Sequence, residues 1–228
     1  MKAVVLSSGG LDSTTCLALA VQKFGAQEVA AISIFYGQRN AAELNAARAV
    51  AKFYNVAHYE LDAAEIFTNS DSSLLDTSTE PLENGSYAAQ IEKSHSPQIA
   101  TYVPFRNGLM ISMATSFAYS LCKDTLELYV GVHDDDAGSA YADCRADFIA
   151  AISAAVRIGT YEKIHIVAPF ICQKKSDVVK VGLELGVPYE LTRSCYERGD
   201  KPCGQCATCI DRARAFALNG VEDPALAK

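Results

Sequence analysis

Short apolar runs alternate with longer, alanine-rich stretches along most of this chain. The apolar runs cover residues 3–6, 29–35, 57–61, 126–132 and 164–167, and their lengths are typical of buried strands. The stretches between them predict helices near residues 13–24, 40–54, 107–121, 145–159 and 175–185. Strands joined by helices in this way usually pair in parallel. The pattern therefore predicts an α/β fold with a doubly wound, mainly parallel, five-stranded sheet.

One long stretch departs from this alternation. Polar residues dominate residues 67–97, and no helical or strand periodicity persists there. Long connections inside compact domains are more often functional or mobile than inert, so we predict either a surface insertion or a lid over the ligand site. The 228 residues suffice for one α/β domain with a small appendage. We assign residues 1–190 to this domain and residues 191–228 to a C-terminal segment packed on it.

Composition limits the classes of partner. The formal net charge of −7 argues against wide contact with RNA or DNA, because that affinity comes chiefly from lysine and arginine. No apolar run is long enough to span a membrane, and the first run ends at Ser7, too early for a signal peptide. We therefore expect a cytoplasmic protein that binds a small molecule, with neither a membrane nor a nucleic acid as a direct partner.

The first predicted strand leads into a loop that contains two consecutive glycines. Its sequence is Leu6-Ser7-Ser8-Gly9-Gly10-Leu11-Asp12-Ser13-Thr14. Glycines let the backbone turn tightly and direct N–H groups at an anion, and the helix that follows presents its positive end to the same charge. The lysine of the Walker loop is absent. A plain serine–glycine turn is the alternative, but the position at a strand end favours a phosphate-binding loop.

Half of the eight cysteines gather near the C-terminus. They are Cys195, Cys203, Cys206 and Cys209. Four thiolates at this spacing can surround zinc tetrahedrally and leave no position open for water, which favours a structural site beside the active site. An iron–sulfur cluster and redox thiols are the alternatives. The other cysteines stand singly in apolar or helical surroundings and are interpreted as core residues; they are Cys16, Cys122, Cys144 and Cys172.

Further polar groups follow strands or begin helices. They are Tyr36, Gln38 and Arg39 after the second strand, Arg106 and Asn107 at the start of the third helix, Asp134 and Asp135 after the fourth strand, Tyr141 and Asp143 beyond it, and Lys175 at the start of the last predicted helix. Ligands of parallel sheets bind beyond the carboxyl ends of the strands, so we expect these groups to surround the glycine loop. Turns, helix caps and a solvated acidic run would use the same residue types.

Together these segments resemble the 7-cyano-7-deazaguanine synthases, a family of PP-loop (N-type) ATP pyrophosphatases. The resemblance covers nearly the whole chain: S-G-G-L-D-S-T-T-C at 8–16, Y-G-Q-R at 36–39, V-P-F-R-N at 103–107, Y-A-D-C-R at 141–145 and the four-cysteine tail. It implies an adenine nucleotide alpha hydrolase-like fold with a small C-terminal zinc-binding segment. It also implies the conversion of 7-carboxy-7-deazaguanine and ammonia to the nitrile preQ0, through an adenylated carboxylate and an amide, in queuosine biosynthesis.

The resemblance also implies roles for the candidate residues. ATP with magnesium would bind loop residues 6–14, with catalytic roles for Asp12, which would help to hold magnesium, and Ser13; Arg106 or Lys175 would offset charge on the α-phosphate. The substrate-binding group would be Tyr36, Gln38, Arg39, Asn107, Asp134, Asp135, Tyr141 and Asp143. Tyr141, Asp143 and the acidic run from Asp134 are the candidates for the base. Zinc would bind the four C-terminal cysteines, and the chain would form a homodimer.

Three departures from the family pattern keep alternatives open. Phe105 stands where many members have glycine, Ala142 where they have proline, and residues 133–136 where they have a shorter loop with glutamate. One alternative is a paralogue that acts on a related carboxylate. Another is a tRNA-modifying PP-loop enzyme such as a thiolase, although the charge of −7 weighs against it. The third is a nucleotide-responsive zinc adaptor without activity.

Overall fold

A five-stranded parallel sheet forms the centre of the structure, a computed structural model that describes residues 1–40, 42–94, 98–133, 141–199 and 201–226. The strands are β1 (Ala3–Leu6), β2 (Val29–Phe35), β3 (Ala57–Asp62), β4 (Leu126–Tyr129) and β5 (Ile164–Val167). They lie in the order β3-β2-β1-β4-β5, and every neighbouring pair is parallel. The predicted fold class is confirmed.

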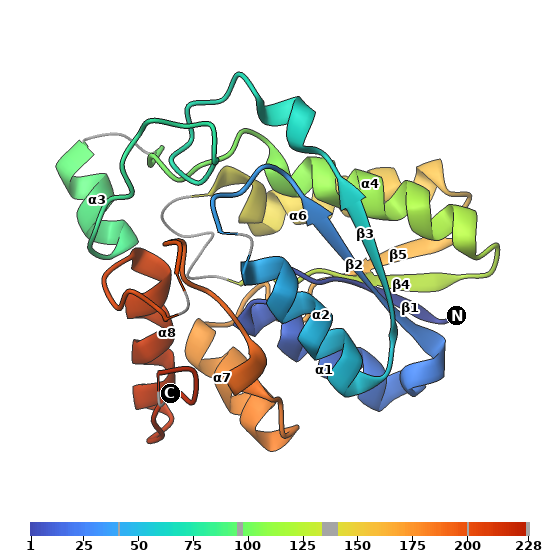
Figure 1. Cartoon of the computed structure of the whole chain (residues 1–228). Coiled ribbons are helices and arrows are strands. Elements are labelled where there is room, and N and C mark those ends of the chain that lie inside the picture. The colour runs from blue at the N-terminus through green and yellow to red at the C-terminus, as the bar shows by residue number, and fades with distance from the viewer. Residues whose placement is uncertain (41, 95–97, 134–140, 200, 227–228) are drawn as a thin grey trace.

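Helices cover both faces of this sheet (Figure 1). On one face lie α1 (Leu11–Phe24), α2 (Ala42–Tyr54), α7 (Lys175–Glu184) and α8 (Ala207–Leu218); α4 (Arg106–Leu121) and α6 (Ala146–Gly159) lie on the other. Short 3-10 helices are η1 (Ala26–Glu28), η2 (Ala64–Phe67), η3 (Ala142–Cys144) and η4 (Tyr189–Leu191). Of the helices that the structure describes, none has the length and apolar character that a membrane span requires.

The central strand β1 shows why the sheet needs cover on both sides. Its successive side chains point to opposite faces, so Val4 packs in the same cluster as Ile111 of α4, whereas Val5 packs with Leu17 of α1. Val4 and Val5 are fully buried. Each buried aliphatic side chain of this size contributes about 1.5–3 kcal/mol. A short, wholly apolar strand therefore fixes the middle of the sheet, and its carboxyl end can hold a loop rigidly.

The fourth strand is shorter than predicted, since it ends at Tyr129 instead of residue 132. A Cβ atom on Gly131 would lie 2.9 Å from the backbone nitrogen of Ser13. The chain after β4 thus passes directly against the first turn of α1, and glycine permits this approach. The turn away from the sheet brings residues 130–132 beside the loop that follows β1.

Two helices were not predicted, α3 (Tyr87–Ser94) and α8. Helix α8 begins directly after Cys206, whose extended backbone forms the N-cap, and it packs through Phe216 against the Tyr189 ring at 5.2 Å between centroids. Its buried Arg212 pairs with Asp223 at 2.7 Å. The helix was overlooked because the cysteines before it are typical of a metal-binding loop. These contacts join residues of 191–228 to the sheet domain.

The polar stretch 67–97 is anchored to its surroundings at several points. Leu74 and Leu75 are buried, and residues 38 and 75 form an isolated antiparallel bridge. A second bridge joins Asn84 to Cys206 in the C-terminal segment. Figure 1 shows α3 near the N-terminal end of α8. The segment therefore connects the end of β2 with the cysteine-rich tail.

Candidate active site

A cavity of about 230 Å³ opens at the carboxyl ends of β1, β2 and β4. Its wall includes Ser7 and Ser8 after β1, Tyr36 after β2 and Gly131 after β4. The strand order reverses between β1 and β4, and open α/β sheets bind their ligands at such a point. The cavity therefore lies where the topology favours a ligand.

The structure brings many of the predicted site residues to this cavity. Those in its wall are Leu6, Ser7, Ser8, Gly10, Asp12, Ser13, Tyr36, Gln38, Arg106, Asn107, Tyr141 and Lys175. Those away from the wall are Gly9, Leu11, Thr14, Arg39 and Asp143. Asp134 and Asp135 lie outside the described residues.

Residues away from the wall hold its members in place. The Thr14 hydroxyl donates to the Gly10 carbonyl at 2.7 Å, and Asp143 Oδ2 accepts a hydrogen bond from the Asn107 backbone nitrogen at 2.8 Å. Arg39, in contrast, donates to the carbonyls of Ser78 and Glu80, both at 2.8 Å. Its guanidinium satisfies backbone groups of the 67–97 stretch that need donors, so the structure does not place it at the predicted substrate site.

The loop after β1 is closed by its own hydroxyl groups. The Ser8 backbone nitrogen donates to Ser13 Oγ at 3.2 Å, and the two serine hydroxyls are 3.1 Å apart. Ser7 Oγ is buried and has no hydrogen-bond partner among the described residues. A buried hydroxyl left in this state costs about 1–3 kcal/mol. We therefore expect the hydroxyl of Ser7 to donate to a ligand in the cavity.

Gly9 gives the loop its shape. Its φ of +77° lies in the left-handed region, and a Cβ atom there would lie 2.3 Å from the carbonyl oxygen of Glu43. Gly9→Ala should therefore lower the free energy of unfolding by about 1–3 kcal/mol through backbone strain and steric clash. Chemical denaturation measures this change.

Gly220→Ala is the matched control for this substitution. Gly220 has a similar φ of +71°, but nothing lies within 4 Å of the position its Cβ would take. The control should show only the conformational cost, about 1 kcal/mol. Equal losses in the two variants would contradict the close approach of α2 to the loop.

Asp12 lies between two basic side chains. Its carboxylate oxygens are 3.8 Å from Lys175 Nζ and 3.6 Å from His133 Nε2. Burial alone would raise the pKa of Asp12, but the charges of Lys175 and His133 lower it to about 2. The group is thus an anion at neutral pH, in the wall of the cavity, beside the loop. A carboxylate oxygen of this kind is a suitable ligand for magnesium.

Arg106 and Tyr36 form a hydrogen-bonded pair in the cavity wall. Arg106 Nη1 donates to the Tyr36 hydroxyl at 3.1 Å, and its guanidinium lies 5.1 Å from the ring centroid. Burial raises the pKa of Tyr36 to about 12, so the phenol keeps its proton. Gln38 Oε1 accepts a hydrogen bond from the Tyr36 backbone nitrogen at 2.9 Å. The pair therefore presents a fixed positive charge to the cavity.

The structure adds wall residues that the sequence analysis did not identify. Among them are Glu43 in the first turn of α2, Tyr87 of α3, and Arg193 and Tyr196 on either side of Cys195. The hydroxyls of Tyr87 and Tyr196 are 2.7 Å apart. Tyr196 directly follows Cys195, and this was the one feature of the sequence that could have indicated a place for Tyr196 near the site. The cysteine-rich tail therefore contributes part of the wall.

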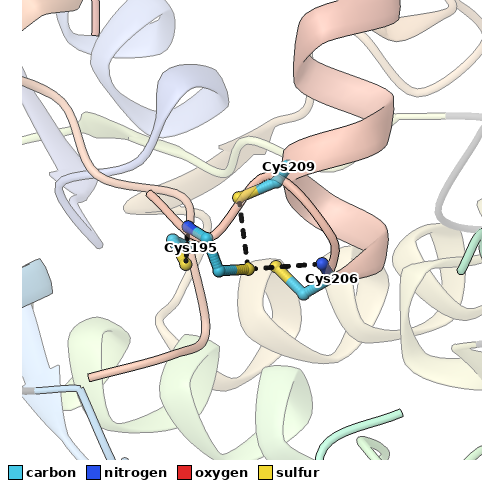
Figure 2. A group of neighbouring side chains, drawn as sticks. Cys195, Cys206 and Cys209 are labelled. Atoms are coloured by element: carbon cyan, nitrogen blue, oxygen red, sulfur yellow. Dashed lines mark hydrogen bonds between the residues drawn. The ribbon is translucent and has the colours of Figure 1, made fainter. Parts of the chain in front are cut away.

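The sulfur atoms of Cys195, Cys203, Cys206 and Cys209 all lie within 4.8 Å of one another. Figure 2 shows the side chains of Cys195, Cys206 and Cys209 turned toward a common point. A tetrahedral zinc–thiolate site needs sulfur atoms about 3.8 Å apart. Backbone nitrogens of Cys203 and Cys206 donate to sulfur atoms of this group, both at 3.3 Å, as they would to thiolates. The cluster can hold a metal ion, as the sequence predicted.

The remaining cysteines have separate environments. Cys16 is fully buried, and burial raises the pKa of its thiol, which suits a core residue. Cys144 lies in the cavity wall, where its Sγ accepts a hydrogen bond from Asn107 Nδ2 at 3.1 Å. Cys122 is half-buried and Cys172 is exposed. The interpretation as a core residue is therefore wrong for Cys172, which follows the end of β5 on the surface.

Comparison with known proteins gives consistent results over the whole chain. A family described as "Queuosine biosynthesis protein QueC" matches residues 2–220. The chain is 39% identical to a 7-cyano-7-deazaguanine synthase of Archaeoglobus fulgidus, over 99% of this chain and 90% of that one. Synthases of the same name from Pseudoalteromonas atlantica and Methanoculleus marisnigri are 40% and 42% identical, each over 98% of this chain and 97% of the other.

Proposed function

We propose that the chain, which belongs to the QueC family of queuosine biosynthesis proteins, catalyses the synthesis of 7-cyano-7-deazaguanine. It would convert 7-carboxy-7-deazaguanine and ammonia to the nitrile with the consumption of ATP. One observation of the structure supports this most strongly. A single cavity joins an anion-binding loop without a lysine to the fixed cation Arg106 and to a wall of tyrosines. That arrangement suits the reaction of ATP at its α-phosphate with a small aromatic carboxylate.

The loop residues fit the phosphates of ATP. The Ser7 hydroxyl lacks a partner among the described residues, and the N-terminal end of α1 adds its positive potential. Asp12, held as an anion, would bind the magnesium ion that accompanies ATP. The ion would neutralise charge on the phosphates. Lys175, 6% exposed and 3.8 Å from Asp12, adds a second cation on the same side.

In the first half of the reaction, an oxygen of the substrate carboxylate attacks the α-phosphorus of ATP. The P–O bond to the β-phosphate breaks, and pyrophosphate leaves with the electron pair onto the loop of residues 7–13. Arg106 and Lys175 stabilise the additional charge on the α-phosphate in the transition state. A preorganised donor of this kind is worth about 10²–10³-fold in rate. Ammonia then attacks the carbonyl carbon and expels AMP, which leaves the amide.

In the second half, the amide oxygen attacks the α-phosphorus of another ATP and pyrophosphate leaves again. Loss of the nitrogen-bound protons and cleavage of the C–O bond to AMP give the nitrile. Both activations are the same phosphorus chemistry, so one loop and one pair of cations can serve both. Both halves of the reaction therefore require the carboxyl carbon, the nitrogen and the α-phosphate to lie in the same cavity.

Several further properties belong to this proposal. We propose zinc as the metal of the four cysteines, because four soft thiolates in a closed tetrahedral set suit it. The division into residues 1–190 and 191–228 follows the metal cluster, and the 67–97 stretch would act as a lid or insertion beside the cavity. We also propose a homodimer, and a cytoplasmic location, where ATP is present and thiolate sites stay reduced.

Two of the three departures from the family pattern lie away from the cavity wall. Phe105 is 57% exposed and outside the cavity wall, and its φ of 54° is a left-handed conformation that suits glycine. A glycine at this position would thus relieve backbone strain. Ala142 is also outside the wall, and residues 134–136 lie outside the described residues.

The direct test is a product assay with the purified full-length protein, its metal content verified. It is incubated with ATP, magnesium, ammonium and 7-carboxy-7-deazaguanine, and the products are followed by mass spectrometry. We expect the amide to appear first and the nitrile after it, with one AMP released in each half of the reaction. Failure of a folded, metal-loaded sample to form either product would exclude this substrate.

A further inference from the structure

We propose that Glu43 is the general base of this active site and that it accepts the protons that the substrate nitrogen loses in both halves of the reaction. This proposal rests on the proposed function. It gives a role to a carboxylate that neither the glycine loop nor the predicted substrate group contains. It also replaces the candidates for the base that the sequence alone suggested.

Glu43 lies beside both the glycine loop and the cavity. It lies in the first turn of α2 and belongs to the wall of the cavity. Its backbone carbonyl approaches the glycine loop so closely that Gly9 has no room for a Cβ atom. The charges of Arg106 of α4 and of Arg193, in the segment before Cys195, act on its carboxylate. The charge of Glu43 also raises the pKa of Tyr36, after β2.

Both arginines donate hydrogen bonds to groups other than Glu43. Arg106 donates to the Tyr36 hydroxyl, and Arg193 Nη2 donates to the carbonyls of Gly199 and Lys201 at 2.8 and 3.2 Å. Among the described residues, the Glu43 carboxylate forms no ion pair and no side-chain hydrogen bond. The first turn of α2 favours a negative charge at this position. Because Glu43 belongs to the cavity wall, a ligand in the cavity can reach it.

Proton affinity separates Glu43 from the other acidic groups nearby. Burial raises the pKa of Glu43 to about 7, although Arg106 and Arg193 oppose this. Lys175 and His133 hold the pKa of Asp12 at about 2 against the effect of burial, so Asp12 is a weak base. Burial also raises the pKa of Tyr141, so its phenol stays protonated. A general base works best with a pKa near the working pH.

Asp143, the remaining described candidate for the base, has a different role. Its Oδ2 accepts a hydrogen bond from the Asn107 backbone nitrogen, at the start of α4, and the residue is outside the cavity wall. It therefore fixes the position of α4. The acidic run from Asp134 lies outside the described residues. Of the carboxylates that the structure places in the wall, Glu43 alone combines access with a suitable proton affinity.

The chemistry requires a base at one position, the nitrogen. When ammonia attacks the adenylated carboxylate, a C–N bond forms, AMP leaves with the electron pair of the broken C–O bond, and one nitrogen proton passes to Glu43. After the amide oxygen is adenylated, the nitrogen loses its two remaining protons in turn. The C≡N bond forms as AMP leaves with its electron pair. Glu43 returns each proton to water before it accepts the next.

The deciding variant is Glu43→Gln, which keeps the size of the side chain and removes its basicity. Transfer of AMP to the carboxylate moves no proton, so exchange of labelled pyrophosphate into ATP, dependent on 7-carboxy-7-deazaguanine, should stay close to the wild-type rate. Amide and nitrile formation should fall about 10²-fold. With uncharged ammonia held constant, the wild-type kcat should fall as pH drops below about 7, because Glu43 becomes protonated. This limb should be absent from the variant.

Two further variants complete the test. Glu43→Asp retains a carboxylate and should recover part of the lost rate, whereas Glu65→Gln alters an exposed carboxylate and should match the wild type. Wild-type nitrile formation by Glu43→Gln would overturn this proposal and leave the proposed function intact. Loss of pyrophosphate exchange in the folded Glu43→Gln variant would also overturn it, because Glu43 would then serve binding. Absence of exchange in the wild type would overturn the proposed function itself.

Discussion

Asp12→Asn should lower nitrile formation by about 10³-fold. Asparagine keeps the shape of the side chain but removes the negative charge that lies 3.8 Å from Lys175 and 3.6 Å from His133. The proposed magnesium ion would lose its protein anion, and two basic groups would face the phosphates without it. Because both activations of ATP need this site, pyrophosphate exchange should fall together with product formation. The rate of exchange at saturating ATP is the primary measurement.

A merely structural role for Asp12 would give a different result. The variant should need a higher magnesium concentration for half-maximal exchange, which a loss of folded protein would not produce. Circular dichroism and chemical denaturation establish the folded fraction. Asp147→Asn is a suitable control, since Asp147 pairs with Arg145 on the exposed surface, where such pairs contribute little. Unchanged exchange in Asp12→Asn would remove the metal-binding role from the account.

Cys206→Ser should abolish stoichiometric metal binding and lower the free energy of unfolding by more than about 4 kcal/mol. Cys206 is 1% exposed, forms the N-cap of α8 and is bridged to Asn84 of the polar stretch. Loss of the metal would therefore loosen both α8 and the segment that carries Tyr196. Elemental analysis gives the metal content, and denaturation gives the stability.

Cys172→Ser provides the comparison, because Cys172 is exposed and distant from the cluster in sequence. It should keep both the metal and the wild-type stability. Retention of one metal ion per chain by Cys206→Ser would contradict the four-thiolate site. We also expect weaker substrate-dependent pyrophosphate exchange in folded Cys206→Ser, since Tyr196 and Arg193 adjoin the cluster and line the cavity.

Local patterns were sufficient to predict the parts of the site that depend on local geometry. The loop of residues 6–14 needs a strand, glycines and a helix in immediate succession, and all three are visible in the sequence. The cysteine spacing likewise limits the distances between the four sulfur atoms. Four of the five strands are short apolar runs, whereas β3 alternates apolar and polar residues. In these cases the residues that determine the structure are neighbours in the chain.

Long-range packing determined the features that were not predicted. Arg39 belongs to the same motif as Tyr36 and Gln38, yet its guanidinium donates to carbonyls of the 67–97 stretch. No local pattern specifies the position of that stretch. In the sequence, nothing distinguishes Glu43 from other acidic residues in the first turn of a helix. The fold places it in the cavity wall. Helix α3 has only 8 residues and lies within a polar stretch, and its Tyr87 contacts Tyr196, which is 109 residues away in sequence.

The conformation of Phe105 is a second kind of feature that could not be predicted from the sequence. The sequence reveals only that a large residue replaces the family's glycine, which suggested a change in the substrate pocket. The structure shows an exposed side chain on a left-handed backbone at the start of α4. The difference therefore concerns the entry into the helix, and the pocket wall nearby is formed by Arg106 and Asn107.

The central claim is that the glycine loop retains pyrophosphate while the α-phosphate of ATP is transferred to a carboxylate. An isotope-transfer experiment tests it most directly. The substrate 7-carboxy-7-deazaguanine, with both carboxylate oxygens replaced by a heavy isotope, is converted by the purified protein, and the nucleotide products are examined by mass spectrometry. The account predicts AMP that carries the heavy oxygen, together with unlabelled pyrophosphate. Heavy oxygen in inorganic phosphate, with ADP as the nucleotide product, would contradict it.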